Sequence, residues 1–267
     1  MISQHGGTLN KSDRRNPFDL TGSRALITGS SKGIGFALAK GLAEAGAAIV
    51  LNGRDQDKLE RAAGELRNEG FTIATSIFDA TERDAVVSSI GKIESEIGII
   101  DILVNNTGIQ YRTPLEDFPA DAWERLINTN LSSVFHVSQA VAKYMIPRMT
   151  GKIINICSVQ SQVGRSTIAP YAATKGGVAM LTKGMCVDWA KYGIQINGIA
   201  PGYFATEMNR PLVENKEFSD WLCKRTPAGR WGKVDELCGT AVFLASKAST
   251  FVNGQIIYVD GGLTSSV

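Results

Sequence analysis

Residues 25–35 read Ala-Leu-Ile-Thr-Gly-Ser-Ser-Lys-Gly-Ile-Gly, an apolar run followed by a glycine-rich loop. Helical spacing of apolar residues begins at Ile34 and continues to Ala45. Glycines at such a point let the backbone turn tightly and approach a phosphate, and the N-terminus of the following helix favours negative charge. The alternative is a turn with a purely structural role. We favour a strand, a phosphate-binding loop and a helix, with the phosphate contacted by Gly29, Ser31, Lys32, Gly33, Ile34 and Gly35.

The same alternation of short apolar runs and longer helical segments continues along the chain. Strands are expected at 25–28, 48–52, 72–78, 102–104, 152–156, 195–199 and 255–259. Helices are expected at 34–45, 56–69, 82–96, 121–149, 171–191 and 234–245. Alternation of this kind is typical of a parallel sheet with helices on both faces. We therefore predict a single α/β domain over residues 18–267, a Rossmann fold with a parallel sheet of about seven strands.

Composition limits the classes of partner. The chain has 267 residues, of which 43% are hydrophobic, and 28 basic against 26 acidic residues give a net charge of +2. Charges of both signs are interspersed, so no basic face for nucleic acid is expected. No apolar run reaches the length of a membrane span. Residues 1–17 are polar, lack the apolar core of a signal peptide and are predicted to be a disordered leader.

The cysteines indicate neither disulfides nor a metal site. They show no C-x-x-C spacing and no paired histidines, and they are Cys157, Cys186, Cys223 and Cys238. We interpret them as reduced thiols in a cytoplasmic protein and expect no bound metal. Cys157 alternates inward on an expected strand, so we interpret it as a core residue and not as a nucleophile.

The end of the second expected strand bears on the choice of cofactor. Enzymes that use NAD usually carry an acidic residue near this point, which binds the ribose 2′-hydroxyl. Here Gly53 is followed by Arg54. A guanidinium can pair with a 2′-phosphate, and Lys32 in the glycine loop can add a second positive charge. We therefore predict NADP as the cofactor; the alternative is that Arg54 is a solvated surface residue.

The ends of the other expected strands carry small and polar residues suited to the same cofactor. Asp79 can accept a hydrogen bond from an adenine amino group, and Thr206 could hold a carboxamide. The remaining candidates form tight turns that would run beside the cofactor: Asn106 and Gly108, then Pro201 and Gly202. Because the carboxyl ends of parallel strands meet at one edge, we expect these residues to lie together.

Tyr171 and Lys175 are four residues apart, and Ser158 lies thirteen residues before the tyrosine. On a helix, residues i and i+4 share one face. A phenol has an ordinary pKa near ~10, and a nearby positive charge lowers it, which would suit a general acid or base. A serine hydroxyl at a strand end could bond a carbonyl oxygen. The alternative is a tyrosine and a lysine on an ordinary amphipathic helix.

Taken together, these motifs resemble the short-chain dehydrogenase/reductase family over residues 18–262. The loop at 28–35 matches the family's T-G-x-x-x-G-x-G, and residues 105–108 resemble its N-N-A-G with Thr107 in place of alanine. Asn130, Ser158, Tyr171 and Lys175 match its catalytic tetrad. The resemblance implies Tyr171 as acid/base, Ser158 as the residue that orients the reacting oxygen, Lys175 as the residue that lowers the tyrosine pKa and binds the nicotinamide ribose, and Asn130 as the holder of a water. It also implies a homotetramer.

Several segments resemble, more narrowly, the members of this family that act on the sugar acid D-gluconate. These segments are 51–54, 108–110, 155–161, 200–208 and 220–227. Polar residues in and beside them could bind such a substrate: Gln110, Arg112, Gln160, Arg165 and Tyr203. Its carboxylate needs a cation, and of the two arginines we favour Arg112 because it follows a strand end directly.

Two other functions remain open at this point. A 3-oxoacyl thioester reductase would share the fold and the tetrad. A non-catalytic dinucleotide-binding regulator would need the loop but not Tyr171 and Lys175 together.

Overall fold

The structure, a computed structural model, describes residues 16–266. The predicted leader 1–17 therefore lies outside the described residues, apart from Asn16 and Pro17. The described chain contains one sheet of seven parallel strands in the order β3-β2-β1-β4-β5-β6-β7. The strands are β1 Arg24–Ile27, β2 Ala48–Gly53, β3 Ile73–Ile77, β4 Ile102–Asn105, β5 Gly151–Ile156, β6 Ile194–Pro201 and β7 Ile256–Val259. The predicted fold class is confirmed.

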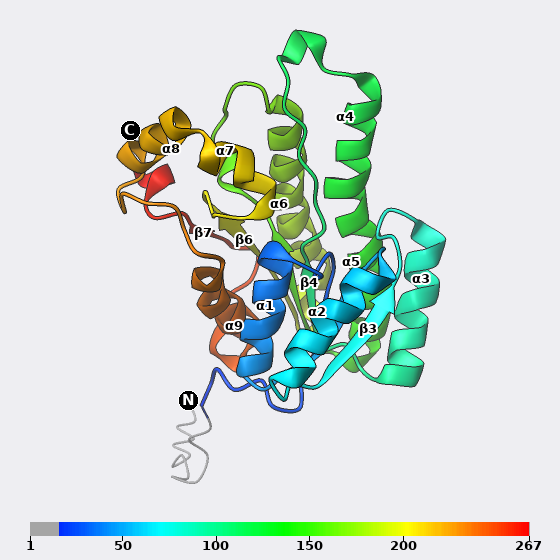
Figure 1. Ribbon diagram of the computed structural model, residues 1–267. Helices are drawn as coiled ribbons and strands as arrows, with labels where there is room; N and C mark the ends of the chain where they lie inside the picture. The colour runs from blue at the N-terminus through cyan, green and yellow to red at the C-terminus, as the bar shows by residue number, and fades with distance from the viewer. Residues whose placement is uncertain (1–15, 267) are drawn as a thin grey trace, which may run out of the picture.

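Helices cover both faces of this sheet (Figure 1). They are α1 Gly33–Glu44, α2 Gln56–Asn68, α3 Arg83–Lys92, α4 Ala120–Ile127, α5 Ser133–Arg148, α6 Ala169–Trp189, α7 Arg210–Glu214, α8 Lys216–Arg225 and α9 Cys238–Ala245. Successive strand residues point to opposite faces. Thus Ala25 and Ile27 pack with α1, α2 and α9, whereas Leu26 packs with α3, α5 and α6.

The order of the strands places a binding cleft. From β1 the chain builds the sheet outward through β2 and β3, then returns to β4 on the other side of β1, with Leu26 paired to Leu103. Such a reversal leaves a crevice beyond the carboxyl ends of the two central strands. The glycine loop follows β1 at this point, so the fold brings the predicted phosphate loop to the crevice.

Two regions differ from the sequence-based expectation. The helix expected over 121–149 is interrupted between α4 and α5 by the π-helical turn η4, Asn128–Ser132. A single wide turn keeps the apolar pattern nearly helical, so periodicity does not reveal it, and such turns often occur at functional sites. Helices α7 and α8 were not predicted: α7 has five residues and carries a proline in its first turn, whereas α8 has ten residues and an N-cap at Asn215 that the sequence analysis missed. Figure 1 shows them above β6 and β7.

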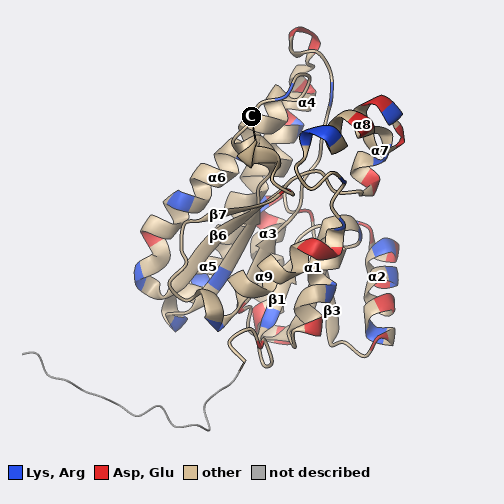
Figure 2. Cartoon of the chain, turned by 90° about the vertical axis from the view of Figure 1, so that its left-hand side faces the viewer, with Lys and Arg blue, Asp and Glu red and all other residues tan. Residues whose placement is uncertain are grey.

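Charged residues of both signs are mixed on the surface that Figure 2 shows. Figure 2 shows basic and acidic residues together on α2 and on α8, with no face of a single sign in this view. Among the described helices, none is both long enough and apolar enough to cross a membrane. Within residues 16–266, no group of three or more His, Cys, Asp or Glu side chains is placed to hold a metal ion.

The close approach of α1 to the glycine loop gives a stability prediction. A Cβ at Gly35 would lie 2.5 Å from the Gly29 carbonyl oxygen and 2.4 Å from Asn106 Nδ2. Because a backbone atom cannot move aside cheaply, we expect Gly35→Ala to lower the free energy of unfolding by about 1–3 kcal/mol. The matched control is Gly64→Ala, inside α2 with nothing within 4 Å of its Cβ. Gly64→Ala should raise the free energy of unfolding by about 0.5–1 kcal/mol, measured by urea denaturation. Equal changes in the free energy of unfolding for the two substitutions would contradict the close packing at Gly35.

Candidate active site

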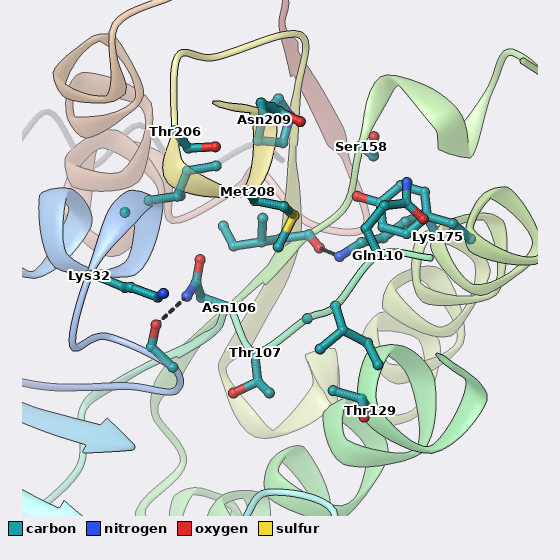
Figure 3. A pocket seen from close by; sticks show the side chains of 18 of the residues that line it. Lys32, Asn106, Thr107, Gln110, Thr129, Ser158, Lys175, Thr206, Met208 and Asn209 are labelled. Atoms are coloured by element: carbon teal, nitrogen blue, oxygen red, sulfur yellow. Dashed lines mark hydrogen bonds between the residues drawn. The ribbon is translucent and has the colours of Figure 1, made fainter. Parts of the chain in front are cut away.

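A cleft of about 420 Å³ lies beyond the carboxyl ends of the central strands, a size typical of cofactor and substrate sites. All predicted cofactor and substrate residues line it except Gly35, which lies beneath the loop, and the tetrad residue Asn130 does not line it either. Figure 3 shows residues from separate elements converging on the cavity: Lys32 after β1, Asn106 and Thr107 after β4, Ser158 after β5, and Thr206 and Met208 after β6. The fold thus joins residues spread over 180 positions of sequence, from Gly29 to Asn209.

Hydrogen bonds lock the glycine loop to the end of β4. The Thr28 hydroxyl oxygen accepts from the backbone nitrogens of Asn106 and Thr107, at 3.0 and 3.1 Å. Asn106 Nδ2 donates to the carbonyl oxygens of Thr28 and Gly29. Gly29 has a φ of +60°, which L side chains rarely adopt. Asn106 therefore holds the loop in its conformation, and the opposite side of the loop lines the cleft.

The two cations predicted at a 2′-phosphate lie at the rim of the cleft, each beside a carboxylate. Arg54 Nη1 is 3.1 Å from Asp79 Oδ2, and Lys32 Nζ is 2.7 Å from Glu207 Oε2. The Arg54 side chain is 74% exposed, so its pair is worth little in free energy. A doubly charged phosphate is a stronger partner than one exposed carboxylate. An anion bound at the rim could therefore replace Glu207 and Asp79 as the partner of these cations.

Tyr171 lies in the first turn of α6 and lines the cleft together with Lys175, as the i, i+4 spacing predicts. Burial is the largest influence on its hydroxyl and raises the pKa of Tyr171 to about 12; the hydrogen bond to Ser158 and the positive charge of Arg112 oppose that rise. Tyr171 is therefore neutral at physiological pH and holds a proton beside the Ser158 hydroxyl. Ser158 also accepts from the Gln160 backbone nitrogen at 3.1 Å, which holds its oxygen in place.

Lys175 is buried one helical turn after Tyr171. Its Nζ donates to the Ile156 carbonyl oxygen at 2.6 Å and lies 5.9 Å from the centroid of the tyrosine ring. Burial lowers the pKa of Lys175 to about 8. The positive charge of Arg112 acts on the hydroxyl of Tyr171 and lowers its pKa. The role that the resemblance implies for Lys175, lowering the pKa of the tyrosine and binding the nicotinamide ribose, stays a prediction.

Asn130 lies in the π-helical turn and is fully buried. Its Oδ1 accepts from the Ile109 backbone nitrogen at 2.8 Å, and its Nδ2 donates to the Ile109 carbonyl oxygen at 3.0 Å. Asn130 therefore holds the chain after β4 in an extended path beside the cleft. A Cβ on Gly108 would lie 3.5 Å from Asn130 Oδ1 and 3.9 Å from Lys175 Nζ, so the tetrad residues are neighbours in space.

The far end of the cleft carries two arginines. Arg112 Nη2 donates to Asn209 Oδ1 and Arg165 Nη1 donates to the Tyr203 hydroxyl, each at 3.4 Å. Neither guanidinium forms an ion pair with a carboxylate of the described chain. Arg112 Nε and Gln160 Oε1 are buried without a hydrogen-bond partner among these residues. Buried polar atoms normally have partners, so both atoms mark a polar binding surface.

Some lining residues escaped the sequence analysis. Glu207, Met208 and Asn209 form a 3-10 turn at the rim, η7, and contact the same cleft. Their position just after Thr206 was the available signal. Asn52 is another: its Nδ2 donates to the Ser76 and Phe78 carbonyl oxygens and ties β2 to the end of β3. Cys157 is buried in the core, and burial raises its pKa to about 11, so it is no nucleophile.

Comparison with known proteins identifies the family. Residues 23–217 match the family model of the short chain dehydrogenases. The chain belongs to the short-chain dehydrogenase/reductase family. It is therefore an oxidoreductase that acts on a CH–OH group, as the tetrad and the glycine loop predicted.

Individual members of the family align with nearly the whole of this chain. The gluconate 5-dehydrogenase of Gluconobacter oxydans (strain 621H) is 59% identical over 250 residues, 94% of this chain and 98% of the relative. The 5-keto-D-gluconate 5-reductase of Escherichia coli (strain K12) is 53% identical over the same shares. A crystal structure of a gluconate 5-dehydrogenase from Burkholderia cenocepacia J2315, in complex with NADP and tartrate, is 64% identical with a TM-score of 0.93 and covers 94% of this chain and 98% of that chain.

The buried hydroxyl of Tyr171 gives a direct test of the site. Tyr171→Phe removes one oxygen, so we expect the fold and cofactor binding to persist while carbonyl reduction falls by roughly 10²-fold or more, the scale of losing a general acid. Initial rates and a fluorescence titration with the reduced cofactor measure the two effects. Tyr192→Phe, after α6 and away from the cleft, is the matched control. Near-normal turnover of Tyr171→Phe would contradict the assigned role.

Proposed function

We propose that this protein interconverts D-gluconate and 5-keto-D-gluconate with NADP as cofactor. The observation that carries the proposal is the pair of arginines at the far end of the cleft, which form no ion pair with a carboxylate of the described chain. A sugar acid presents a carboxylate at one end, and arginine binds carboxylates in a forked geometry. The gluconate 5-dehydrogenases and 5-keto-D-gluconate 5-reductase similar to this chain support the same substrate.

The residues of the cleft fit a dinucleotide. At Gly29 and Gly35 the loop leaves no room for a side chain, because a Cβ there would press on the segment after β4. Lys32 and Arg54 stand where a 2′-phosphate could replace Glu207 and Asp79 as partner. Gly29, Ser31, Lys32, Gly33 and Ile34 would hold the phosphates, Asp79 the adenine, and Lys175 the nicotinamide ribose. Asn106, Gly108, Pro201 and Gly202 would line the nicotinamide half, with Thr206 at the carboxamide. When bound, NADPH would supply the hydride in reduction, and the oxidised cofactor would accept it in oxidation.

The protein's own residues would move the proton. In reduction, neutral Tyr171 donates its proton to the carbonyl oxygen at carbon 5, and the Ser158 hydroxyl bonds the same oxygen and holds it in line. In oxidation the transfers reverse, and Tyr171 accepts the alcohol proton. The nearby charge of Arg112 lowers the pKa of Tyr171 and so stabilises the phenolate that remains after donation. Gln110, Gln160 and Tyr203 supply polar groups for the substrate hydroxyls.

We also propose a cytoplasmic homotetramer. Apolar side chains are exposed along the outer faces of α5 and α6, among them Phe135, Tyr144, Met180 and Val187. Exposed apolar patches of this kind commonly mark contacts between subunits. All four cysteines are free, which suits a reducing compartment. Light scattering of the purified protein measures the assembly.

Arg54 gives a prediction about the cofactor. We expect the unmutated protein to prefer NADPH over NADH by about tenfold to a few hundredfold, because charge-assisted hydrogen bonds to a phosphate contribute about 1.5–3 kcal/mol each. Arg54→Ala should erode this preference, mainly by raising the KM for NADPH. Arg61→Ala, which removes an arginine of α2 that does not line the cleft, is the control. Equal use of both cofactors by the unmutated protein would show that Arg54 does not meet the phosphate.

The substrate is tested by comparing carbonyl compounds at equal concentration with NADPH. We expect 5-keto-D-gluconate to be reduced faster than 2-keto-D-gluconate, the neutral ketohexose D-fructose and an acetoacetyl thioester, because only the first places a ketone at carbon 5 with a carboxylate at the arginines. Faster reduction of the thioester would favour the 3-oxoacyl reductase alternative and leave the family unchanged. Loss of all reduction despite NADPH binding would favour a regulator.

A further inference from the structure

Arg165 lies in an irregular segment before α6, yet its guanidinium has a defined place. Its Cζ is 4.5 Å from the centroid of the Phe218 ring, a cation–π distance. Its Nη1 donates to the Tyr203 hydroxyl at 3.4 Å. Arg165 makes no ion pair with a carboxylate of the described residues, so an aromatic ring of α8 is the main contact of its charged end.

Phe218 is itself held by a compact group of aromatic residues, Tyr203, Phe218 and Trp231. The ring centroid of Phe218 lies 5.7 Å from that of Tyr203 and 6.3 Å from that of Trp231. Trp231 Nε1 donates to Ser219 Oγ at 2.8 Å, which ties the group to α8. Leu222 of α8 is buried against Val159, the residue after Ser158. Helix α8, and with it Phe218, is therefore packed against the strand end that carries Ser158.

The two arginines of the cleft repel each other. The charge of Arg165 is one of the influences that lower the pKa of Arg112, after burial. Without a restraint, the guanidinium of Arg165 would swing into solvent to reduce this repulsion. The negative face of an aromatic ring attracts a guanidinium and opposes that movement. The geometry thus keeps two positive charges at one end of the cleft ready for an anion.

We infer that Phe218 is a positioning residue that holds Arg165 at the substrate carboxylate, so that α8 sets the preference of the enzyme for acidic over neutral sugars. The inference rests on the proposed sugar-acid substrate and adds to it a residue outside the lining of the cleft. Arg165 would bind the carboxylate together with Arg112. Phe218 touches neither the substrate nor the cofactor and acts only through Arg165.

The test compares two substitutions at Phe218. Phe218→Leu keeps an apolar side chain but removes the ring, whereas Phe218→Tyr keeps the ring. We expect Phe218→Leu to raise the KM for 5-keto-D-gluconate by about three- to tenfold, the scale of one cation–π contact. The kcat, the KM for NADPH and the KM for D-fructose should stay within about twofold of those of the unmutated protein. Only the binding of the substrate carboxylate depends on the position of Arg165. Phe218→Tyr should restore the low KM.

Two further variants isolate the contact. In an Arg165→Ala background, Phe218→Leu should add nothing, because the group it positions is gone. Trp123→Leu is the matched control: it removes an aromatic ring of α4 that is 44% exposed and does not line the cleft. Its KM for 5-keto-D-gluconate should equal that of the unmutated protein.

The outcomes separate this inference from the proposed function. If the unmutated protein reduces 5-keto-D-gluconate but Phe218→Leu leaves its KM unchanged, the inference is overturned and the proposed function stands. Equal increases in KM for 5-keto-D-gluconate and D-fructose would also overturn it, because they would show a general structural role. If the unmutated protein does not reduce 5-keto-D-gluconate, the proposed function fails and the inference fails with it.

Discussion

The Thr28 hydroxyl, where the ends of β1 and β4 meet, accepts hydrogen bonds from two successive backbone nitrogens, those of Asn106 and Thr107. These bonds, with the return bonds from Asn106 to the loop carbonyls, lock two segments that are almost eighty residues apart. The strand order reverses between β1 and β4, which leaves a crevice beyond their carboxyl ends. The hydrogen bonds around Thr28 form the floor of this crevice. Every other part of the site is placed relative to this junction.

Differences in burial give the titratable groups of the cleft different charge states. Burial keeps Tyr171 neutral and lowers the pKa of Lys175 to about 8. The arginines remain charged at the far end, and Lys32 and Arg54 remain exposed at the rim. The cleft therefore presents a proton donor between two cationic ends. A molecule with a carboxylate and a cofactor with an added phosphate suit these two ends.

The segment from β6 through α8 connects the ends of the cleft. It contributes Glu207 beside Lys32, Asn209 beside Arg112, and Phe218 beside Arg165. Its fold depends on short helices and on an aromatic group whose members come from separate turns. Variation in this segment could change the substrate while the sheet and the tetrad stay the same, since function resides in sites carried by a common fold.

The spacing of apolar residues along the chain determined the seven strands, most of the helices and the glycine loop, because such periods are local properties. The tetrad came from the resemblance to the family. The sequence also indicated which residues would meet at the strand ends, since parallel strands bring their carboxyl ends to one edge. Only the tertiary structure decided the π-helical turn that buries Asn130, the pairing of Lys32 with Glu207, and the approach of Arg112 to Tyr171. It likewise placed both arginines at one end, where the sequence had favoured Arg112 alone. Such contacts join residues far apart in the chain, and their energies depend on burial and distance, which no local pattern records.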